Sequence, residues 1–191
     1  MRDCSWIPSK FPNARPDNFK CCSDRTNHLP HNGYNCIAWA AGKTDKWWWP
    51  VDVPDAFWPI PIDSKDPVTL TAFIEAFKTE HYEICSDAAF EDGYEKVAIY
   101  VDQSSEPTHA ARQLPSGVWT SKMGKGEDIE HDTLEVIENI HYGKPKIFLK
   151  RPNLLCQKQN KRKTLFSRLL EFLRTLLKRF SPTAKRNQTS S

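Results

Sequence analysis

Several features that define common protein classes are missing from this 191-residue sequence. It contains only seven glycines and no glycine-rich phosphate loop, so motifs that cradle a nucleotide are absent. No run of 18 apolar residues occurs, which argues against a membrane-spanning helix. The first ten residues lack the apolar stretch of a secretory signal, so we expect a cytoplasmic protein.

The six cysteines do not follow a metal-binding pattern. No two of them are separated by two residues, and Cys21 and Cys22 are adjacent. Scattered Cys and His could still converge in a fold, but the spacing predicts no metal site and no cofactor. Because no export signal is visible, we expect all six cysteines to be reduced thiols.

Charge is divided unevenly along the chain, whose formal net charge is +3. Residues 158–191 hold ten Lys and Arg against one acid, Glu171, whereas residues 1–157 hold 17 basic and 23 acidic residues. The acidic body argues against nucleic-acid binding, and only the basic tail is expected to be attracted to anions.

Two segments predict helices in the first half of the body. Residues 36–42 (CIAWAAG) predict one or two helical turns, with Asn35 as the N-cap and Gly42 as the C-cap. Residues 47–61 carry four Trp and four Pro, which predicts a long loop held by its aromatic residues. Residues 68–80 have the apolar spacing of an amphipathic helix.

The second half of the body predicts strands. Residues 82–85 and 96–101 are rich in β-branched and aromatic side chains, and residues 108–114 and 118–123 flank a turn typical of a hairpin. Residues 146–149 predict a closing strand. A helix followed by antiparallel strands is an α+β pattern, so residues 1–152 are expected to form one α+β domain.

Cys36 is the leading candidate for a nucleophile. It opens the first predicted helix, where free N–H groups and the helix dipole lower the pKa of a thiol and stabilise developing negative charge. His109, on the strand that follows, is the candidate general base. The Cys36 N–H and the Asn35 side chain would stabilise an oxyanion. The competing interpretations are a buried core thiol and a structural histidine.

The register of the hairpin decides which side chain orients the His109 imidazole. With a three-residue loop, Ala111 pairs with Ser121, which then shares the face of His109. With a two-residue loop, Gln113 takes that place. We favour Ser121 over Gln113, and an exposed carboxylate such as Asp128 stays open as a third choice.

Several segments together resemble an uncharacterised bacterial domain family of unknown function over about residues 10–152. These segments are Asn35–Ala40, Val97–Val101, Thr108–Gln113, Trp119–Gly124, Asp128–His131, Tyr142–Gly143 and Lys150–Pro152. The order of a helical cysteine and a strand histidine is similar to the papain-like superfamily, including cell-wall peptidases of the NlpC/P60 type. That resemblance implies a papain-like fold, with a helix packed on a small antiparallel sheet, and thiol acyl chemistry at Cys36.

The C-terminal residues form a separate part. Residues 153–163 predict a polar linker, residues 164–181 a basic amphipathic helix, and residues 182–191 a disordered tail. The apolar side of this helix must be buried against the body, against a partner helix or in a membrane interface. Because its polar side is basic, an anionic membrane surface is the favoured partner.

These features predict a cysteine hydrolase or acyltransferase that acts on an amide or ester. Cys36 would attack the carbonyl, His109 would transfer the proton, and Ser121 or Gln113 would orient the imidazole. The alternative is a non-catalytic binding or adaptor domain that uses the basic helix to hold a membrane or a partner. In either case we expect a cytoplasmic protein that can attach peripherally to a membrane.

Overall fold

The computed structural model describes residues 4–22, 33–153 and 171. The chain divides into two units, residues 1–153 and 154–191, and the fold described here is that of the first. The predicted linker, amphipathic helix and tail lie outside the described residues, except for Asn153 and Glu171. Those predictions therefore stay predictions.

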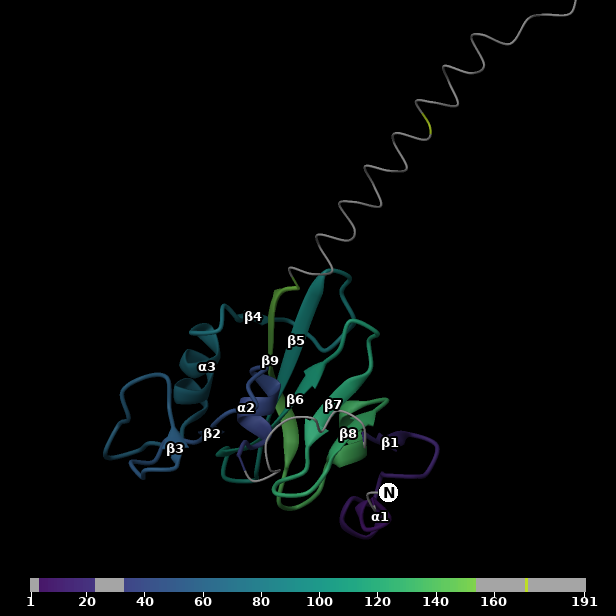
Figure 1. Cartoon of the computed structure of the whole chain (residues 1–191), viewed down its shortest axis with the longest axis horizontal. Helices are drawn as coiled ribbons and strands as arrows, with labels where there is room; N and C mark the ends of the chain where they lie inside the picture. Colours follow the sequence, from purple (N-terminus) through teal and green to yellow (C-terminus); the bar gives the residue numbers. More distant parts are fainter. Residues whose placement is uncertain (1–3, 23–32, 154–170, 172–191) are drawn as a thin grey trace, which may run out of the picture. The chain divides into compact units, whose positions relative to one another are not determined.

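A seven-stranded antiparallel sheet forms the centre of the first unit, in the order β1-β8-β7-β6-β5-β9-β4 (Figure 1). Its strands are β1 (Phe19–Cys21), β4 (Glu83–Cys85), β5 (Tyr94–Val101), β6 (Pro107–Gln113), β7 (Trp119–Lys122), β8 (Asp128–His131) and β9 (Lys144–Pro152). β5 lies between β6 and β9, and its β-branched and aromatic residues suit that central position.

Short helices and a second, smaller sheet accompany the main sheet. The described helices are α1 (Ile7–Lys10), α2 (Cys36–Ala40), α3 (Leu70–Lys78) and the 3-10 helix η1 (Leu134–Ile137). α2 packs on β6 and β7 (Figure 1). β2 (Trp47–Trp48) and β3 (Ala56–Phe57) pair in parallel, so the predicted long loop is wrong at these four residues. Pro50 and Pro54 lie between the two strands, where they do not interrupt either ladder.

Hydrophobic residues pack on both faces of the main sheet, because successive residues of a strand point to opposite sides. Val97, Ile99 and Ala110 belong to one cluster with residues of α2 and α3, which we call the α2-side core. Ala98 and Ala111 belong to a second cluster with residues of α1 and η1, which we call the α1-side core. The sheet therefore separates two cores.

This architecture corrects the predicted fold class. The resemblance implied a papain-like helix on a small antiparallel sheet, whereas the chain forms a large, mostly antiparallel sheet with few, short helices. Much of the difference comes from β1 and β8 at one edge of the sheet, which the sequence analysis does not predict. Their sequences, FKC and DIEH, lack a clear alternation of apolar and polar residues.

Several local predictions are confirmed. α2 begins after Asn35, whose side chain accepts the N–H of Ala38. It is followed by Gly42, whose φ of +81° is the left-handed conformation expected of a C-cap glycine. α3, β4, β5 and β9 lie where a helix and three strands are predicted.

Two cysteines near the N-terminus are joined. Cys4 and Cys21 form a disulfide with Cα atoms 6.0 Å apart, which ties the segment before α1 to β1. The prediction that all six cysteines are reduced is therefore wrong for this pair, whereas Cys36 and Cys85 carry free thiols. None of the helices in the described ranges combines the length and the apolar character needed to cross a membrane.

Candidate functional site

Cys36 is the first residue of α2, and Asn35 holds it there. The Asn35 Oδ1 accepts the N–H of Ala38 at 3.1 Å and the N–H of Trp48 at 3.2 Å. The Asn35 Nδ2 donates to the Trp48 carbonyl at 2.7 Å. Asn35 therefore starts α2 and fastens it to β2. The amide that was predicted to stabilise an oxyanion is occupied by backbone groups on both its oxygen and its nitrogen.

The Cys36 side chain is buried, and its thiol is protonated at neutral pH. Burial raises the pKa of Cys36 from 9.0 to about 11. Hydrogen bonds from the backbone N–H groups of Ala110, Ile37 and Cys36 itself act in the opposite direction, as does the charge of Lys122. The short α2 therefore does not produce the resting thiolate that its N-terminal position alone suggests.

His109 lies on β6 and is completely buried. Its ring stacks on that of Tyr142, with centroids 4.2 Å apart and planes 13° apart, and it meets Tyr100 edge-on at 5.4 Å. Burial lowers the pKa of His109 from 6.5 to about 3, and the charge of His131 contributes in the same direction. The imidazole is therefore neutral at physiological pH.

The β6–β7 hairpin brings Ser121 to His109. Gln113 pairs with Trp119, which is the register of the predicted three-residue loop and places Ser121 on the face of the imidazole. The His109 Nε2 and the Ser121 Oγ are 3.2 Å apart. Ser121 is thus the side chain that holds this nitrogen.

The other two candidates for orienting the imidazole bind elsewhere. The Gln113 Nε2 donates to the Gly117 carbonyl at 3.2 Å, which closes the hairpin. Asp128 accepts a hydrogen bond from the Tyr34 hydroxyl at 2.9 Å. Neither side chain is a hydrogen-bond partner of the imidazole.

A second buried histidine extends this contact. The Ser121 Oγ is 3.0 Å from the Nε2 of His131, and the His131 Nδ1 is 2.8 Å from the Thr133 carbonyl. Burial lowers the pKa of His131 from 6.5 to about 4, against the opposing effect of the Thr133 carbonyl. His109, Ser121 and His131 therefore form a continuous buried chain that ends at a backbone oxygen.

The other ring nitrogen of His109 is unusual. Its Nδ1 is buried and has no hydrogen-bond partner among the described residues. Nearly all buried polar atoms in proteins are hydrogen-bonded, so an unpaired one requires an explanation, and a functional role is one such explanation. This nitrogen is the one that points away from Ser121.

The Cys36 sulfur reaches the same part of β6 without hydrogen bonding to His109. The Ala110 N–H, next to His109 in sequence, hydrogen-bonds the sulfur. Burial and then the charge of Cys36 raise the pKa of Tyr142, the ring that stacks on His109. Cys36 belongs to the α2-side core and Tyr142 packs against the α1-side core, so the thiol and the imidazole approach β6 from different faces.

His131 is the member of this group that the sequence analysis does not identify as a site residue. In the structure His131 ends β8 and pairs with Trp119 of β7. The only sequence signal would have been a strand after the β7 hairpin, which would bring residue 131 beside residues 119–121. The segment DIEH is too short and too polar for that prediction.

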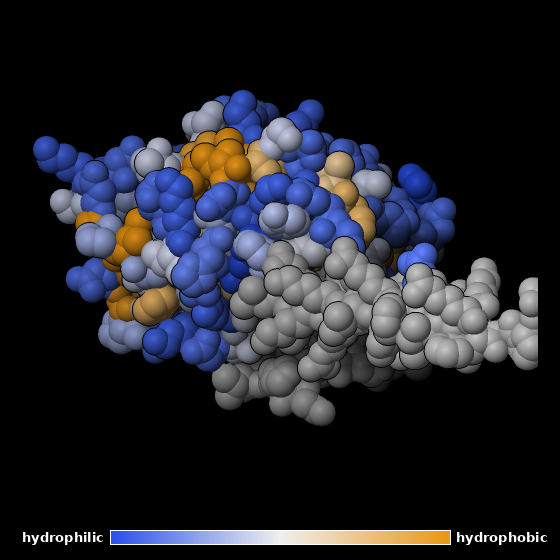
Figure 2. Space-filling view, turned by 90° about the horizontal axis from the view of Figure 1, so that it is seen from above, coloured by the Kyte–Doolittle hydropathy of each residue, from blue (hydrophilic) through white to orange (hydrophobic). Residues whose placement is uncertain are grey.

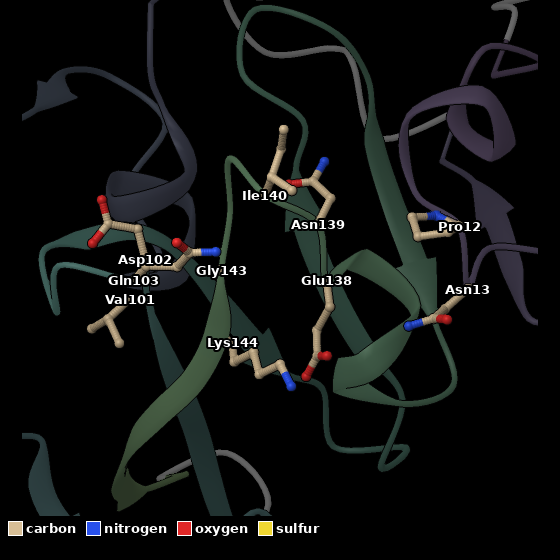
Figure 3. Close-up of a pocket in the computed structure, with 10 residues that line it drawn as sticks. All are labelled: Pro12, Asn13, Val101, Asp102, Gln103, Glu138, Asn139, Ile140, Gly143 and Lys144. Carbon is tan, nitrogen blue, oxygen red and sulfur yellow. The ribbon is translucent and has the colours of Figure 1, made fainter.

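Cavities open on the surface of the first unit. Figure 2 shows hydrophobic residues gathered in separate groups on a largely hydrophilic face. One cavity of about 430 Å³ is lined by Pro12, Asn13, Val101, Asp102, Gln103, Glu138, Asn139, Ile140, Gly143 and Lys144 (Figure 3). Within it the Lys144 and Glu138 side chains point toward one another, whereas Ile140 points away (Figure 3).

A second cavity, of about 530 Å³, lies beside the start of α2. It is lined by Gly33, Asp45, Lys46, Trp47, Pro54, Asp55, Ala56 and Phe57. Gly33 is three residues before Cys36, and Trp47 precedes the residue that Asn35 binds. In the part of the chain that the structure describes, no three His, Cys, Asp or Glu side chains are placed to hold a metal ion.

Comparison with known proteins gives one match. A family described as a domain of unknown function (DUF7689) matches residues 25–150. No curated protein and no solved structure matches the chain. The expected membership of a family of unknown function is therefore confirmed, whereas the papain-like resemblance finds no support.

Proposed function

The chain belongs to the DUF7689 family, and we propose that it is a thiol hydrolase or acyltransferase that acts on an amide or ester through Cys36 and His109. The observation that supports this most is the buried Nδ1 of His109, which has no partner among the described residues. An unpaired buried polar atom costs about 1–3 kcal/mol. An unpaired nitrogen kept at such a cost suggests a proton donor that binds Nδ1 during the reaction, and we assign this role to the Cys36 thiol.

The proposed reaction has two stages, acylation of Cys36 and cleavage of the resulting thioester. The Cys36 sulfur attacks the substrate carbonyl carbon while its proton moves to the Nδ1 of His109. The C–N or C–O bond then breaks, and the leaving amine or alcohol takes that proton, which leaves a thioester on Cys36. Water or a second nucleophile cleaves the thioester, with His109 again accepting and returning the proton.

The charge states of the resting site determine how the proton moves. The pKa values of about 11 for Cys36 and about 3 for His109 put the cost of forming a separated thiolate and imidazolium at roughly 10 kcal/mol. Proton transfer therefore accompanies attack on the carbonyl rather than preceding it. At rest the sulfur and the imidazole approach β6 from different faces. The proposal therefore also requires substrate binding to bring the sulfur and Nδ1 within hydrogen-bond reach, about 3 Å.

The surroundings of Cys36 suit this chemistry. The backbone N–H groups of Ile37 and Cys36, which lower the pKa of the thiol, are the donors that we assign to the oxyanion formed on the attacked carbonyl. The 530 Å³ cavity next to the start of α2 is the approach through which an amide or ester would arrive, and Trp47 and Phe57 offer it apolar contacts.

Trapping of the acyl-enzyme tests the proposal. The intact protein is incubated with 4-nitrophenyl acetate, and its mass is measured before and after digestion to locate the acetyl group. We expect acetylation at Cys36 that disappears in Cys36→Ser and falls by about 10²–10⁴-fold in His109→Gln. Cys85→Ser and His141→Gln, at positions outside the site, are matched controls that should behave as the unaltered protein. Equal acetylation in His109→Gln would refute the proposal.

A second candidate function is a non-catalytic binding domain, and the burial of Cys36 and His109 with neutral charge states favours it. In that case the basic residues 158–191 would attach the chain to an anionic membrane surface or a partner. Flotation with vesicles that contain phosphatidylserine, with and without residues 158–191, tests this function. Binding should depend on the segment and weaken as salt rises; equal flotation of both proteins would contradict it.

A further inference from the structure

We infer that His131 is a positioning residue that fixes which nitrogen of His109 carries a proton, acting through Ser121 and the Thr133 carbonyl. This inference deepens the proposed function, because a nitrogen can accept the Cys36 proton only if it holds a lone pair. It concerns the resting protein, however, and its test does not depend on turnover.

The hydrogen-bond chain has a direction, and the Thr133 carbonyl sets it. A carbonyl oxygen only accepts, so the His131 Nδ1 that faces it at 2.8 Å carries the proton. Neutral His131 then has its lone pair on Nε2, which accepts the Ser121 hydroxyl proton across 3.0 Å. The Ser121 oxygen in turn accepts the Nε2–H of His109 across 3.2 Å. The lone pair of neutral His109 is therefore on Nδ1.

The reverse direction leaves two defects. If the Ser121 hydroxyl donated to His109, the His131 Nε2 would have to donate to Ser121, and the lone pair of its Nδ1 would face the Thr133 carbonyl. His109 would then carry a buried Nδ1–H, for which the described residues provide no acceptor. Ser121 itself is equally satisfied in both directions, since a hydroxyl both donates and accepts. The preference therefore has two sources: the Thr133 carbonyl, which fixes the proton of His131, and the lack of an acceptor for a proton on the His109 Nδ1.

The charge states of His109 and His131 agree with this direction of the hydrogen bonds. Burial lowers the pKa values of both histidines, to about 3 for His109 and about 4 for His131, so both rings are neutral at pH 7. In each ring one nitrogen donates and the other accepts. Ser121 and both histidines are completely buried, so water does not compete for these bonds.

Nitrogen NMR of the imidazole rings reads the protonation state directly. The full-length protein is labelled with ¹⁵N-histidine, and long-range ¹H–¹⁵N correlations at pH 7 assign each ring nitrogen as protonated or not. His109→Gln and His131→Gln identify the two buried rings by loss of their signals. We expect protonated Nε2 in His109 and protonated Nδ1 in His131. A protonated Nδ1 in His109 of the unaltered protein would overturn the inference without any further variant.

Two substitutions of His131 test the direction of control. His131→Leu removes the acceptor of the Ser121 hydroxyl, which should then donate to His109 in part of the molecules, so that the proton of His109 is divided between Nδ1 and Nε2. His131→Gln can accept from Ser121 through its oxygen and donate to the Thr133 carbonyl through its amide, so the proton of His109 should stay on Nε2. A His109 population that carries its proton only on Nε2 in folded His131→Leu would contradict the inference. If that variant does not fold, Ser121→Ala is measured in its place. A His109 population that carries its proton only on Nε2 in Ser121→Ala would also contradict the inference.

A purely structural role for His131 would not move the proton of His109, whatever it did to the melting temperature. Failure of the proposed function has a different signature, namely acetylation of Cys36 that does not respond to His109→Gln. If both hold, Cys36 acetylation in His131→Leu should fall in proportion to the fraction of His109 whose proton NMR places on Nδ1, and it should stay within a few-fold of the unaltered protein in His131→Gln.

Discussion

The two buried histidines make the stability of the fold depend on pH in a defined direction. Their pKa values are lowered in the folded protein, to about 3 for His109 and about 4 for His131, from 6.5. Between these values the unfolded chain binds protons that the folded chain does not. Stability is therefore complete above pH 6.5 and is lost as the pH falls toward 3.

The size of the loss follows from the pKa differences. Each pH unit well below 6.5 costs about 1.4 kcal/mol per histidine, and the first unit costs less because the unfolded imidazole is already half-protonated at pH 6.5. From pH 6.5 to pH 4.5, each of the two residues therefore removes about 2 kcal/mol from the free energy of unfolding. Together they account for about 4 kcal/mol, a large part of the roughly 5–15 kcal/mol that stabilises a typical domain.

Urea unfolding at pH 6.5 and pH 4.5, followed by fluorescence, measures this loss. The same measurement on His109→Gln/His131→Gln removes both groups, and His141→Gln removes an exposed histidine as the matched control. Two carboxyl groups also titrate at acid pH. Hydrogen bonds to Ser86 and Lys96 lower the pKa of Asp87, whereas burial raises the pKa of Glu138, so their effects on stability oppose one another. Both groups are present in every variant and therefore do not affect the comparison. We expect the double variant to lose about 4 kcal/mol less than the unaltered protein. An equal loss in the two proteins would refute the burial of neutral imidazoles.

Three further predictions concern single features of the fold and the site. Ser121→Ala should lower acetylation of Cys36 about 10–100-fold in the mass assay, because the imidazole of His109 loses the partner that positions it. It should also lower the melting temperature, because the Nε2 atoms of two buried histidines lose their partner at about 1–3 kcal/mol each. An unchanged acetylation rate would contradict the role of Ser121. Gly143→Ala should destabilise the fold by about 3 kcal/mol or more, on the scale of overpacking and backbone strain. A Cβ at this position would lie 1.8 Å from the Val101 carbonyl oxygen, and the φ of +69° is unfavourable for alanine. A calorimetric melting temperature equal to that of the unaltered protein would contradict this packing. Replacing Cys4 and Cys21 by serine should cost about 3 kcal/mol, the value expected for a loop of this length. Alkylation in urea followed by mass mapping should leave Cys4 and Cys21 unmodified until a reductant is added. Alkylation of either residue without reductant would contradict the disulfide.

Local sequence signals predict much of the neighbourhood of Cys36 and Ser121. Asn35 and Gly42 bound α2 because capping depends on residues only a few positions apart. The turn after Gln113 fixes the hairpin register, and with it the position of Ser121 beside His109. Both features are decided within fewer than ten residues of sequence.

Contacts between distant segments could not be predicted in the same way. Tyr142 stacks on His109 from a position 33 residues away, and no spacing rule connects the two. His131 reaches Ser121 only because β8 joins the sheet, and the short polar segment DIEH gives little indication of a strand. The charge state of Cys36 also depends on the whole fold, since burial outweighs the backbone hydrogen bonds that the start of α2 supplies.

The pH dependence of Cys36 acetylation tests the central claim most directly. With His109 accepting the proton at a pKa of about 3, the acetylation rate should be flat between pH 6 and pH 9. In His109→Gln only the thiolate of a group with a pKa of about 11 can react, so the rate should be low and rise about tenfold with each pH unit. A tenfold rise per pH unit in the unaltered protein would show that Cys36 reacts without His109, and the proposed enzyme would be excluded.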